Sequence, residues 1–249
     1  MTKAYYFLWR RAGTDRNEFI NYYEKPHLDL ILANLPKHDD FRRNYPAWHR
    51  YNTPSLGLQP FDALTAITYG SPAKFDEAIG IFYTQPFNQA VTEDELRFLD
   101  RSRMKFVMVD EIIDQLPENE WRPAPAVGDH AKLIRLIKRP ATLNATEFRK
   151  AYEATQVPAI RSTIINCIDY RRNYVRATDS HNFTTPELQG SLSESDMIAC
   201  DLIEELCFAS SADADAAVQA LAVVGHHSPL LTDMQRTPGI ICDQRLRSA

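Results

Sequence analysis

The sequence has few glycines and lacks the motifs that depend on them. Its eight glycines leave little material for phosphate-binding loops, and no G-x-G-x-x-G, P-loop or G-x-S-x-G motif occurs. These absences argue against a nucleotide-dependent enzyme and against a serine hydrolase. No apolar run approaches the roughly 18 residues of a membrane-spanning helix, and the first residues do not resemble a secretory signal. We therefore expect a cytoplasmic protein with no membrane partner.

Cysteine is also scarce, and the four cysteines form no C-x-x-C pair (Cys167, Cys200, Cys207 and Cys242). Cys200 and Cys207 lie in an apolar stretch and are predicted to be small core residues. Neither a disulfide nor a metal site is expected from these spacings.

No strong excess of positive charge is present. The net charge is −5 and the pI is near 5.8, which argues against a general nucleic-acid partner. With 44% hydrophobic and 10% aromatic residues, the chain has enough apolar material to fold rather than remain disordered.

The most informative feature that is present is an internal repeat. Partial matches occur in the same order in both halves, first at an offset of 129 positions and later at 139 and 133. The matching pairs are Glu18 and Glu147, Tyr23 and Tyr152, residues 41–45 and 170–174, Asp62 and Asp201, and Asp110 and Asp243. The changing offset indicates loops of unequal length. We predict a tandem duplication.

Each half predicts the same order of elements. The expected strands are residues 4–10, 41–45, 63–69 and 106–109, and then 133–139, 170–176, 202–208 and 240–242. Helices are expected after Asp15 and Asn144, each followed three residues later by a glutamate as in a capping box, and near Pro72 and Ser211. This β-α-β-β-α-β order is the ferredoxin-like unit. We predict an α+β fold in which two such repeats pack as an intramolecular dimeric α+β barrel that encloses a pocket. The expected domains are residues 1–115 and 130–249, joined by a Pro-rich linker at 116–129.

Several motifs of the first half resemble a known family. They are Trp9-Arg10-Arg11, Glu18-Phe19, Tyr22-Tyr23-Glu24-Lys25-Pro26-His27, Phe61-Asp62-Ala63 and Glu95-Leu96-Arg97-Phe98-Leu99-Asp100-Arg101-Ser102. Together they resemble the EthD-like branch of the dimeric α+β barrel superfamily. The resemblance implies a small-molecule enzyme, because relatives belong to ether-degradation clusters or tailor aromatic polyketides by decarboxylation or dehydration. Other relatives are cofactor-free monooxygenases, polyketide cyclases and haem-dependent enzymes. The second half is a degenerate copy, in which Gln156 replaces His27.

His27 is the leading catalytic candidate. An imidazole titrates near neutral pH, which suits proton transfer. The alternative is a histidine that only interacts with the helix dipole. Because the second half lacks this histidine, we expect one active centre.

Strand alternation selects the next candidates. It places Tyr6 and Arg10 on one face of their strand, and Arg135 and Arg139 on the corresponding face of the second half. We predict that all four face the cavity, where the arginines would bind an anionic group. The alternative is ion pairing with Glu204, Glu205 or Asp62. Glu205 is likewise predicted to face the cavity, either as an acid/base group or only to neutralise Arg135.

An aromatic and basic segment follows the second expected strand. Tyr45, Trp48 and His49 would form the wall of a pocket for a flat ligand. Nucleic-acid stacking is the alternative, which the acidic composition disfavours. Tyr22 has no tyrosine counterpart in the second half, so it is a further functional candidate.

The sequence therefore predicts an enzyme that needs no cofactor and acts on an aromatic or polyketide-like small molecule. The reaction would be lyase-like, with His27 as general acid or base and Tyr6, Tyr22 or Tyr45 as proton donors. The alternatives are a cofactor-free or haem-assisted monooxygenase and a binding protein without turnover. The sequence does not decide whether the protein forms a homodimer through the helices or the linker.

Overall fold

Both halves of the chain contribute strands to a single sheet. A computed structural model describes residues 1–47, 60–114, 131–164, 166–176, 200–224, 228–236 and 240–246. The expected linker at 116–129, Trp48 and His49 lie outside these residues. The strands of the first half are β1 (Thr2–Leu8), β2 (Asp40–Pro46), β3 (Ala63–Tyr69) and β4 (Lys105–Ile113). Those of the second half are β5 (Ala131–Lys138), β6 (Cys167–Val175), β7 (Leu202–Phe208), β8 (Gln235–Arg236) and β9 (Ile240–Leu246).

Four helices begin where the sequence predicts them, after Asp15 and Asn144 and at Pro72 and Ser211. The first half has α1 (Arg16–Tyr22), a π-helix η1 (Tyr23–His27), α2 (Leu28–Asn34), α3 (Pro72–Phe82), α4 (Phe87–Glu95) and a short 3-10 helix η3 (Arg101–Arg103). The second half has α5 (Ala145–Thr163), α6 (Ser211–Val223) and the 3-10 helix η5 (Pro229–Leu231). Asp15 and Asn144 both form capping boxes, with Glu18 and Glu147 as the returning partners.

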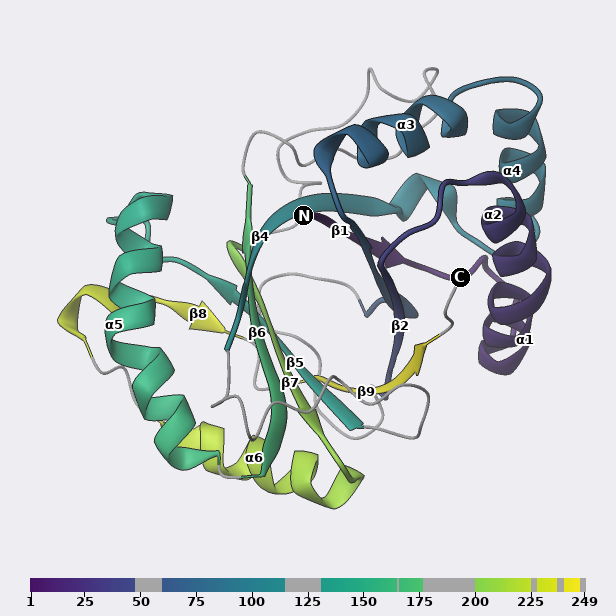
Figure 1. Cartoon of the computed structure of the whole chain (residues 1–249). Helices are drawn as coiled ribbons and strands as arrows, with labels where there is room; N and C mark the ends of the chain where they lie inside the picture. The colour runs from purple at the N-terminus through teal and green to yellow at the C-terminus, as the bar shows by residue number, and fades with distance from the viewer. Residues whose placement is uncertain are drawn as a thin grey trace.

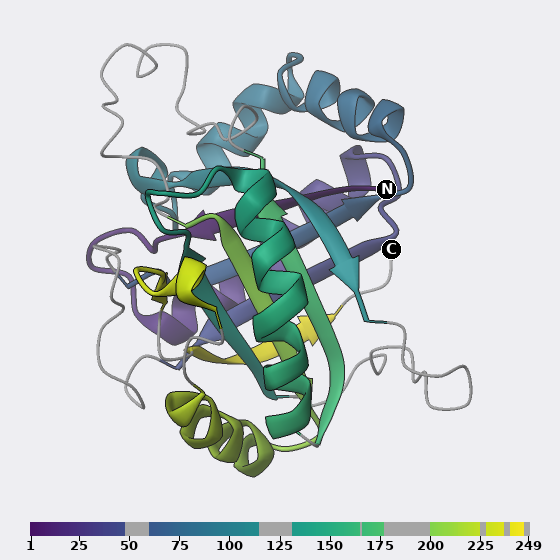
Figure 2. The same ribbon diagram turned by 90° about the vertical axis from the view of Figure 1, so that its left-hand side faces the viewer.

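The strands close into a barrel (Figure 1). Each half has the ferredoxin-like strand order, β4-β1-β3-β2 and β6-β7-β5-β9, and the pairs β4–β6 and β2–β9 join the two sheets. The helices of the first half lie outside one sheet, and α5 and α6 lie outside the other (Figures 1 and 2). The predicted intramolecular dimeric α+β barrel is therefore confirmed, whereas the duplication itself stays a prediction.

The first strand of each half begins two residues earlier than predicted and also ends earlier. Beyond Leu8, the backbone N–H of Arg10 donates to the Asp62 carboxylate at 2.8 Å instead of continuing the pairing with β3. Beyond Lys138, the N–H of Arg139 donates to Asp201 at 2.9 Å in the same way. These aspartates therefore end the strands.

The interior of the barrel is filled by side chains. Apolar residues from strands of both halves, among them Phe7, Leu64 and Ile203, form one cluster inside it. Glu205 accepts hydrogen bonds from the Tyr5 hydroxyl at 2.9 Å and from Lys132 at 3.2 Å. The barrel interior is therefore a core with a buried ionic network rather than a binding pocket.

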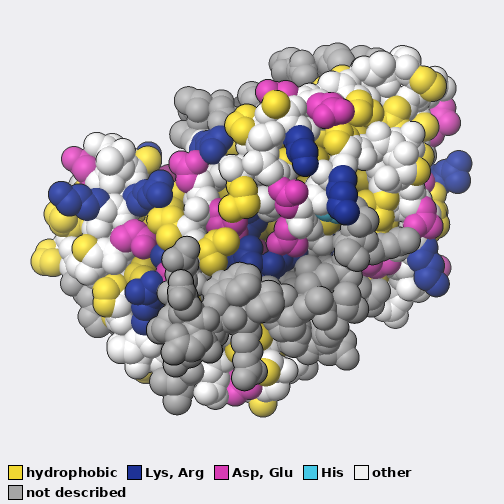
Figure 3. All heavy atoms as spheres, in the orientation of Figure 1, with side chains coloured by type: hydrophobic (Ala, Val, Ile, Leu, Met, Phe, Trp, Pro, Cys, Tyr) yellow, Lys and Arg dark blue, Asp and Glu magenta, His cyan; other side chains and the backbone are white. Residues whose placement is uncertain are grey.

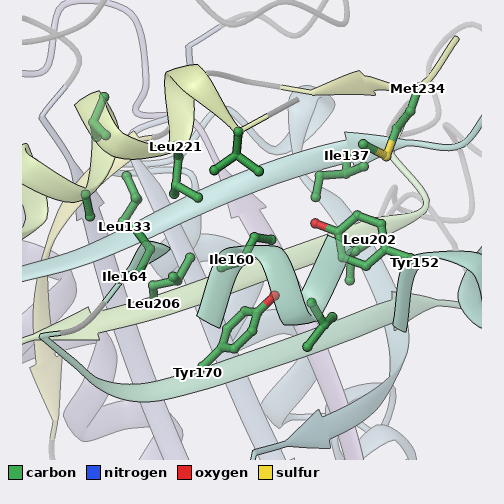
Figure 4. Close-up of a cluster of buried hydrophobic side chains, with 14 of the residues drawn as sticks. Leu133, Ile137, Tyr152, Ile160, Ile164, Tyr170, Leu202, Leu206, Leu221 and Met234 are labelled. Carbon is green, nitrogen blue, oxygen red and sulfur yellow. The ribbon is translucent and has the colours of Figure 1, made fainter. Parts of the chain in front are cut away.

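The outer face of the second sheet is covered by a separate core. Its side chains come from β5, β6, β7, α5 and α6, and Figure 4 shows Leu133, Ile137, Tyr152, Tyr170 and Leu206 in contact across these layers. On the molecular surface, acidic and basic side chains are interspersed over the face shown in Figure 3. None of the described helices is both long and apolar enough to pass through a bilayer.

Candidate functional site

A cavity lies between the first sheet and the helices that cover it. Its volume is about 60 Å³, and most of its lining is apolar. The apolar residues include Leu8, Ile31, Leu35, Phe41, Ile67, Phe75, Ile79, Phe82, Leu99 and Met104. The polar groups that line it are Tyr6, Tyr23, His27, Thr65, Tyr69, Glu95 and Arg101. The number of polar groups is thus small, as in most small-molecule sites.

His27 reaches this cavity from an irregular helix. Pro26 has no N–H to donate, and the segment Tyr23–His27 is π-helical, with the N–H of Leu28 bonded to the carbonyl of Tyr23. The imidazole packs against the rings of Tyr23 and Phe98, with centroids 5.2 and 5.1 Å away. Only 6% of His27 is exposed, so its ring orientation is set by the surrounding packing.

Asp94, at the end of α4, holds His27 from the other side. Its Oδ2 lies 2.7 Å from Nδ1 of His27, and its Oδ1 accepts a hydrogen bond of 2.8 Å from the Tyr22 hydroxyl. Burial tends to raise the pKa of Asp94, but the hydrogen bonds from His27 and Tyr22 outweigh it and keep that pKa below its ordinary value. Asp94 is therefore ionised at neutral pH and accepts a hydrogen bond from Nδ1–H.

This arrangement leaves Nε2 of His27 for a ligand. When Nδ1 carries the proton that is shared with Asp94, a neutral imidazole has its lone pair on Nε2. A histidine oriented by a carboxylate in this way can accept a proton and return it without moving.

A second charged pair borders the same cavity. Glu95 follows Asp94 and is 4% exposed, and its Oε2 lies 3.0 Å from Nη1 of Arg101. Burial raises the pKa of Glu95 above its ordinary value, although the nearby His27 and Arg101 oppose this shift.

Tyr6 lines this cavity, on the strand face that points toward the helices and not toward the barrel interior, where the pocket was expected. Its ring packs against Phe106 with centroids 5.1 Å apart. Burial raises the pKa of the Tyr6 phenol well above its ordinary value, so the phenol keeps its proton and can donate a hydrogen bond. Tyr22 lies outside the lining, and its hydroxyl donates to Asp94, the partner of His27.

At the position that corresponds to Tyr6, the second half has a buried ion pair. Arg135 pairs with Glu204 in the β5–β7 register as Tyr6 pairs with Thr65 in β1–β3. The Arg135 guanidinium donates to Glu204 at 2.7 Å, and Tyr152 and Tyr170 also donate to that carboxylate. The expectation that Arg135 shares a cavity with Tyr6 is wrong, because each lies on the outer face of a different sheet.

Glu205 also differs from the prediction. It lies on the opposite face of β7 from Glu204, inside the barrel, and its partners are Lys132 and Tyr5 rather than Arg135. Burial raises its pKa, but Lys132 and Lys3 outweigh burial and hold that pKa well below the ordinary value. Glu205 is therefore an ionised member of the internal network.

Arg10 and Arg139 lie at the strand ends, outside the cavity. Arg139 donates from Nε to Asp201 at 2.9 Å, and Nε of Arg10 lies 3.7 Å from Asp62. The ion-pairing alternative with Asp62 therefore describes Arg10. Arg10 also borders a separate, more open polar hollow.

Tyr45 is part of the core rather than of the cavity wall. It is 1% exposed, and its hydroxyl donates to Glu24 at 2.6 Å, beside the two hydrogen bonds that Glu24 accepts from Arg43. Tyr174, Glu153 and Arg172 repeat this contact in the second half. A pocket role for Tyr45 is wrong because its side chain does not line the cavity.

Sequence reasoning missed Asp94, Glu95 and Arg101. Asp94 and Glu95 belong to α4, a helix that the predicted β-α-β-β-α-β repeat does not include. One signal was present: Phe87, Val91 and Glu95 occupy the buried stripe of that helix at intervals of four, so a glutamate stands at a core position. Within the described residues, no group of three or more His, Cys, Asp or Glu side chains is placed to hold a metal ion.

Comparison with known proteins shows a similarity in the first half of the chain. Residues 11–102 match the family model of the EthD domain, a segment that contains every polar group of the His27–Asp94 and Glu95–Arg101 pairs. No curated protein sequence matches the chain.

Solved structures show the same fold at low sequence identity. A provisionally assigned monooxygenase from Lactobacillus acidophilus NCFM superposes with a TM-score of 0.53 at 11% identity, over 99% of this chain and 95% of that one. An anthrone oxidase-like protein gives 0.50 at 7% identity, over 98% and 92%. A provisionally assigned chlorite dismutase gives 0.51 at 9% identity, over 98% and 95%.

Proposed function

Because residues 11–102 of this chain match the EthD family model and lie within a dimeric α+β barrel, we propose that the protein is an enzyme that moves protons on an aromatic or polyketide-like small molecule without a cofactor. The reaction would be a decarboxylation, dehydration or cyclisation. The observation that carries this proposal is the His27–Asp94 pair, with Nε2 left for the cavity.

The chemistry follows from the charges and the lining. Nε2 of His27 would take a proton from an acidic C–H or O–H group, and the electron pair would move onto a conjugated oxygen as an enolate or phenolate. The protonated Tyr6 phenol would donate a hydrogen bond to that oxygen. The apolar walls suit a flat ring system and exclude water from the reacting atoms.

A second candidate, a cofactor-free oxygenase, is favoured by the names of two structures with the same fold, a monooxygenase and an anthrone oxidase-like protein. Its first step is the same, because a carbanion or phenolate must form before it reacts with oxygen. The two candidates therefore share the role of His27 and differ in whether oxygen is consumed.

Anthrone, which has an acidic C–H group, is a suitable probe. Under nitrogen in D₂O, the wild-type protein should accelerate deuterium exchange at that carbon, and His27→Ala should reduce the acceleration by about 10²- to 10⁴-fold. Lys25→Ala, exposed in the same π-helix, is the matched control. Oxygen uptake measured in air, together with carbon dioxide release from 1,3-dihydroxy-2-naphthoate, separates the two candidates.

Two results would overturn the proposal. One is that the protein accelerates neither deuterium exchange in anthrone nor carbon dioxide release from 1,3-dihydroxy-2-naphthoate, or that His27→Ala leaves the acceleration unchanged. The other is a Soret band that forms on addition of haemin to the wild type and disappears in His27→Ala, since this would make His27 an axial ligand.

A further inference from the structure

Arg101 differs from the other buried arginines of the molecule. Its side chain is 14% exposed and lines the cavity, yet its Nε and Nη1 atoms are buried and donate no hydrogen bond to the described residues. An arginine carries five N–H donors, and buried donors without partners cost free energy. Arg43 and Arg135, by contrast, donate to Glu24 and Glu204 in good geometry.

Glu95 balances the charge of Arg101 but does not satisfy its donors. Oε2 of Glu95 lies 3.0 Å from Nη1, and this contact does not have hydrogen-bond geometry. The rest of the cavity wall near this end is apolar, with Leu99 and Met104 as close neighbours in sequence. The guanidinium therefore has donors for an additional acceptor, and the cavity is the space in which that acceptor would lie.

We infer that Arg101 binds the acidic oxygen of the molecule that fills this cavity. The ligand class is a flat, apolar ring system with one negatively charged oxygen group, such as a carboxylate or phenolate. An oxyanion would accept charge-assisted hydrogen bonds from Nε and Nη1, the two donors that Glu95 leaves unused. This inference rests on the proposed function, since it names the ligand class of the same site.

Glu95 is then a competitor of the ligand. Both carboxylates would share one guanidinium, so an anionic ligand weakens the pairing of Glu95 with Arg101. Removing the charge of Glu95 should consequently strengthen anion binding, whereas removing Arg101 should weaken it. A salt bridge that only supports the fold would not produce opposite effects of this kind.

The test compares 2-naphthoate with its neutral counterpart 2-naphthamide by isothermal titration calorimetry. The wild type should prefer the carboxylate. Arg101→Gln should weaken 2-naphthoate binding by about 10- to 100-fold and change 2-naphthamide binding little. Glu95→Gln should tighten 2-naphthoate binding only. Arg103→Gln is the matched control, because Arg103 is exposed in the same short helix and does not line this cavity.

The double variant Glu95→Gln/Arg101→Gln guards against a folding defect, since it leaves no unpaired buried charge. It should bind both probes with similar affinity. Two results would overturn the inference. One is an equal loss of affinity for both probes in Arg101→Gln and in the folded double variant. The other is a wild type that binds 2-naphthoate no more tightly than 2-naphthamide.

The binding test is independent of turnover. His27→Ala should retain the preference for 2-naphthoate while losing the exchange activity. If the wild type prefers 2-naphthoate but shows no exchange activity, the proposed function is rejected and the anion site is retained. If it shows exchange activity but no preference for 2-naphthoate, only the role of Arg101 is rejected.

Discussion

Nδ1 of His27 lies 2.7 Å from Oδ2 of Asp94, although 67 positions separate the two residues in the sequence. The contact depends on α4, because this helix places Asp94 beside the π-helical segment that presents His27. Because Asp94 accepts a hydrogen bond from Nδ1–H, the contact fixes the tautomer of neutral His27 with its proton on Nδ1.

The first prediction concerns that proton. In wild type, neutral His27 should carry it on Nδ1, and Asp94→Asn should reduce this tautomer because the negative acceptor is lost. Long-range ¹⁵N spectra of histidine-labelled protein measure the tautomer directly. Glu93→Gln, an exposed change on the same helix, is the control. An unchanged tautomer in Asp94→Asn would contradict the pairing.

The second prediction concerns the pH dependence of stability. The pKa of Glu95 is raised by burial, so between the unfolded value of about 4.3 and the higher folded value the native state binds more protons than the unfolded state. The contribution of Glu95 to the free energy of unfolding should therefore fall as the pH rises through this window. Urea unfolding of wild type and Glu95→Gln over a pH series tests it. The wild type should lose stability relative to the variant, and a difference of the opposite slope would refute the prediction.

The third prediction concerns the buried Arg135–Glu204 pair of the second half. Arg135→Leu leaves Glu204 as an unpaired buried charge and should cost about 3–5 kcal/mol of stability. Arg135→Leu/Glu204→Leu should recover most of this loss, because no buried charge remains. Chemical denaturation measures the free energy of unfolding of both variants. A double variant that is less stable than Arg135→Leu would show that the pairing does not balance these charges.

The fourth prediction separates Tyr45 from the site. Tyr45→Phe removes a hydrogen bond to Glu24 and should lower the free energy of unfolding by about 1–2 kcal/mol. Binding of 2-naphthoate should not change, because Tyr45 does not line the cavity. Tyr174→Phe is a natural control, since Tyr174 makes the same contact with Glu153. A selective loss of binding in Tyr45→Phe would restore the predicted pocket role.

Most of the fold could be predicted because its signals are local. The strands β3 and β7 occupy the predicted residues, and the caps at Asp15 and Asn144 mark two helix starts. Strand alternation predicts that Tyr6 and Tyr5 lie on opposite faces of their strand, and they do, although the pocket was expected on the other side of the sheet. These features depend on periodicity and on neighbours within a few residues.

The position of the cavity could not be predicted in the same way. Alternation gives the face of a strand but not whether that face turns toward the barrel interior or the helices. Glu205 and Arg135 were therefore expected together, whereas the sheet separates them. Asp94 was missed for a related reason, since α4 has no counterpart in the repeat that organised the sequence.

The pairs β4–β6 and β2–β9 have a consequence for how the molecule unfolds. Because each half supplies hydrogen-bond partners to the edge strands of the other, neither sheet can open without exposing the other. The two halves should therefore lose their structure in one cooperative transition with a common midpoint, as a single folding unit.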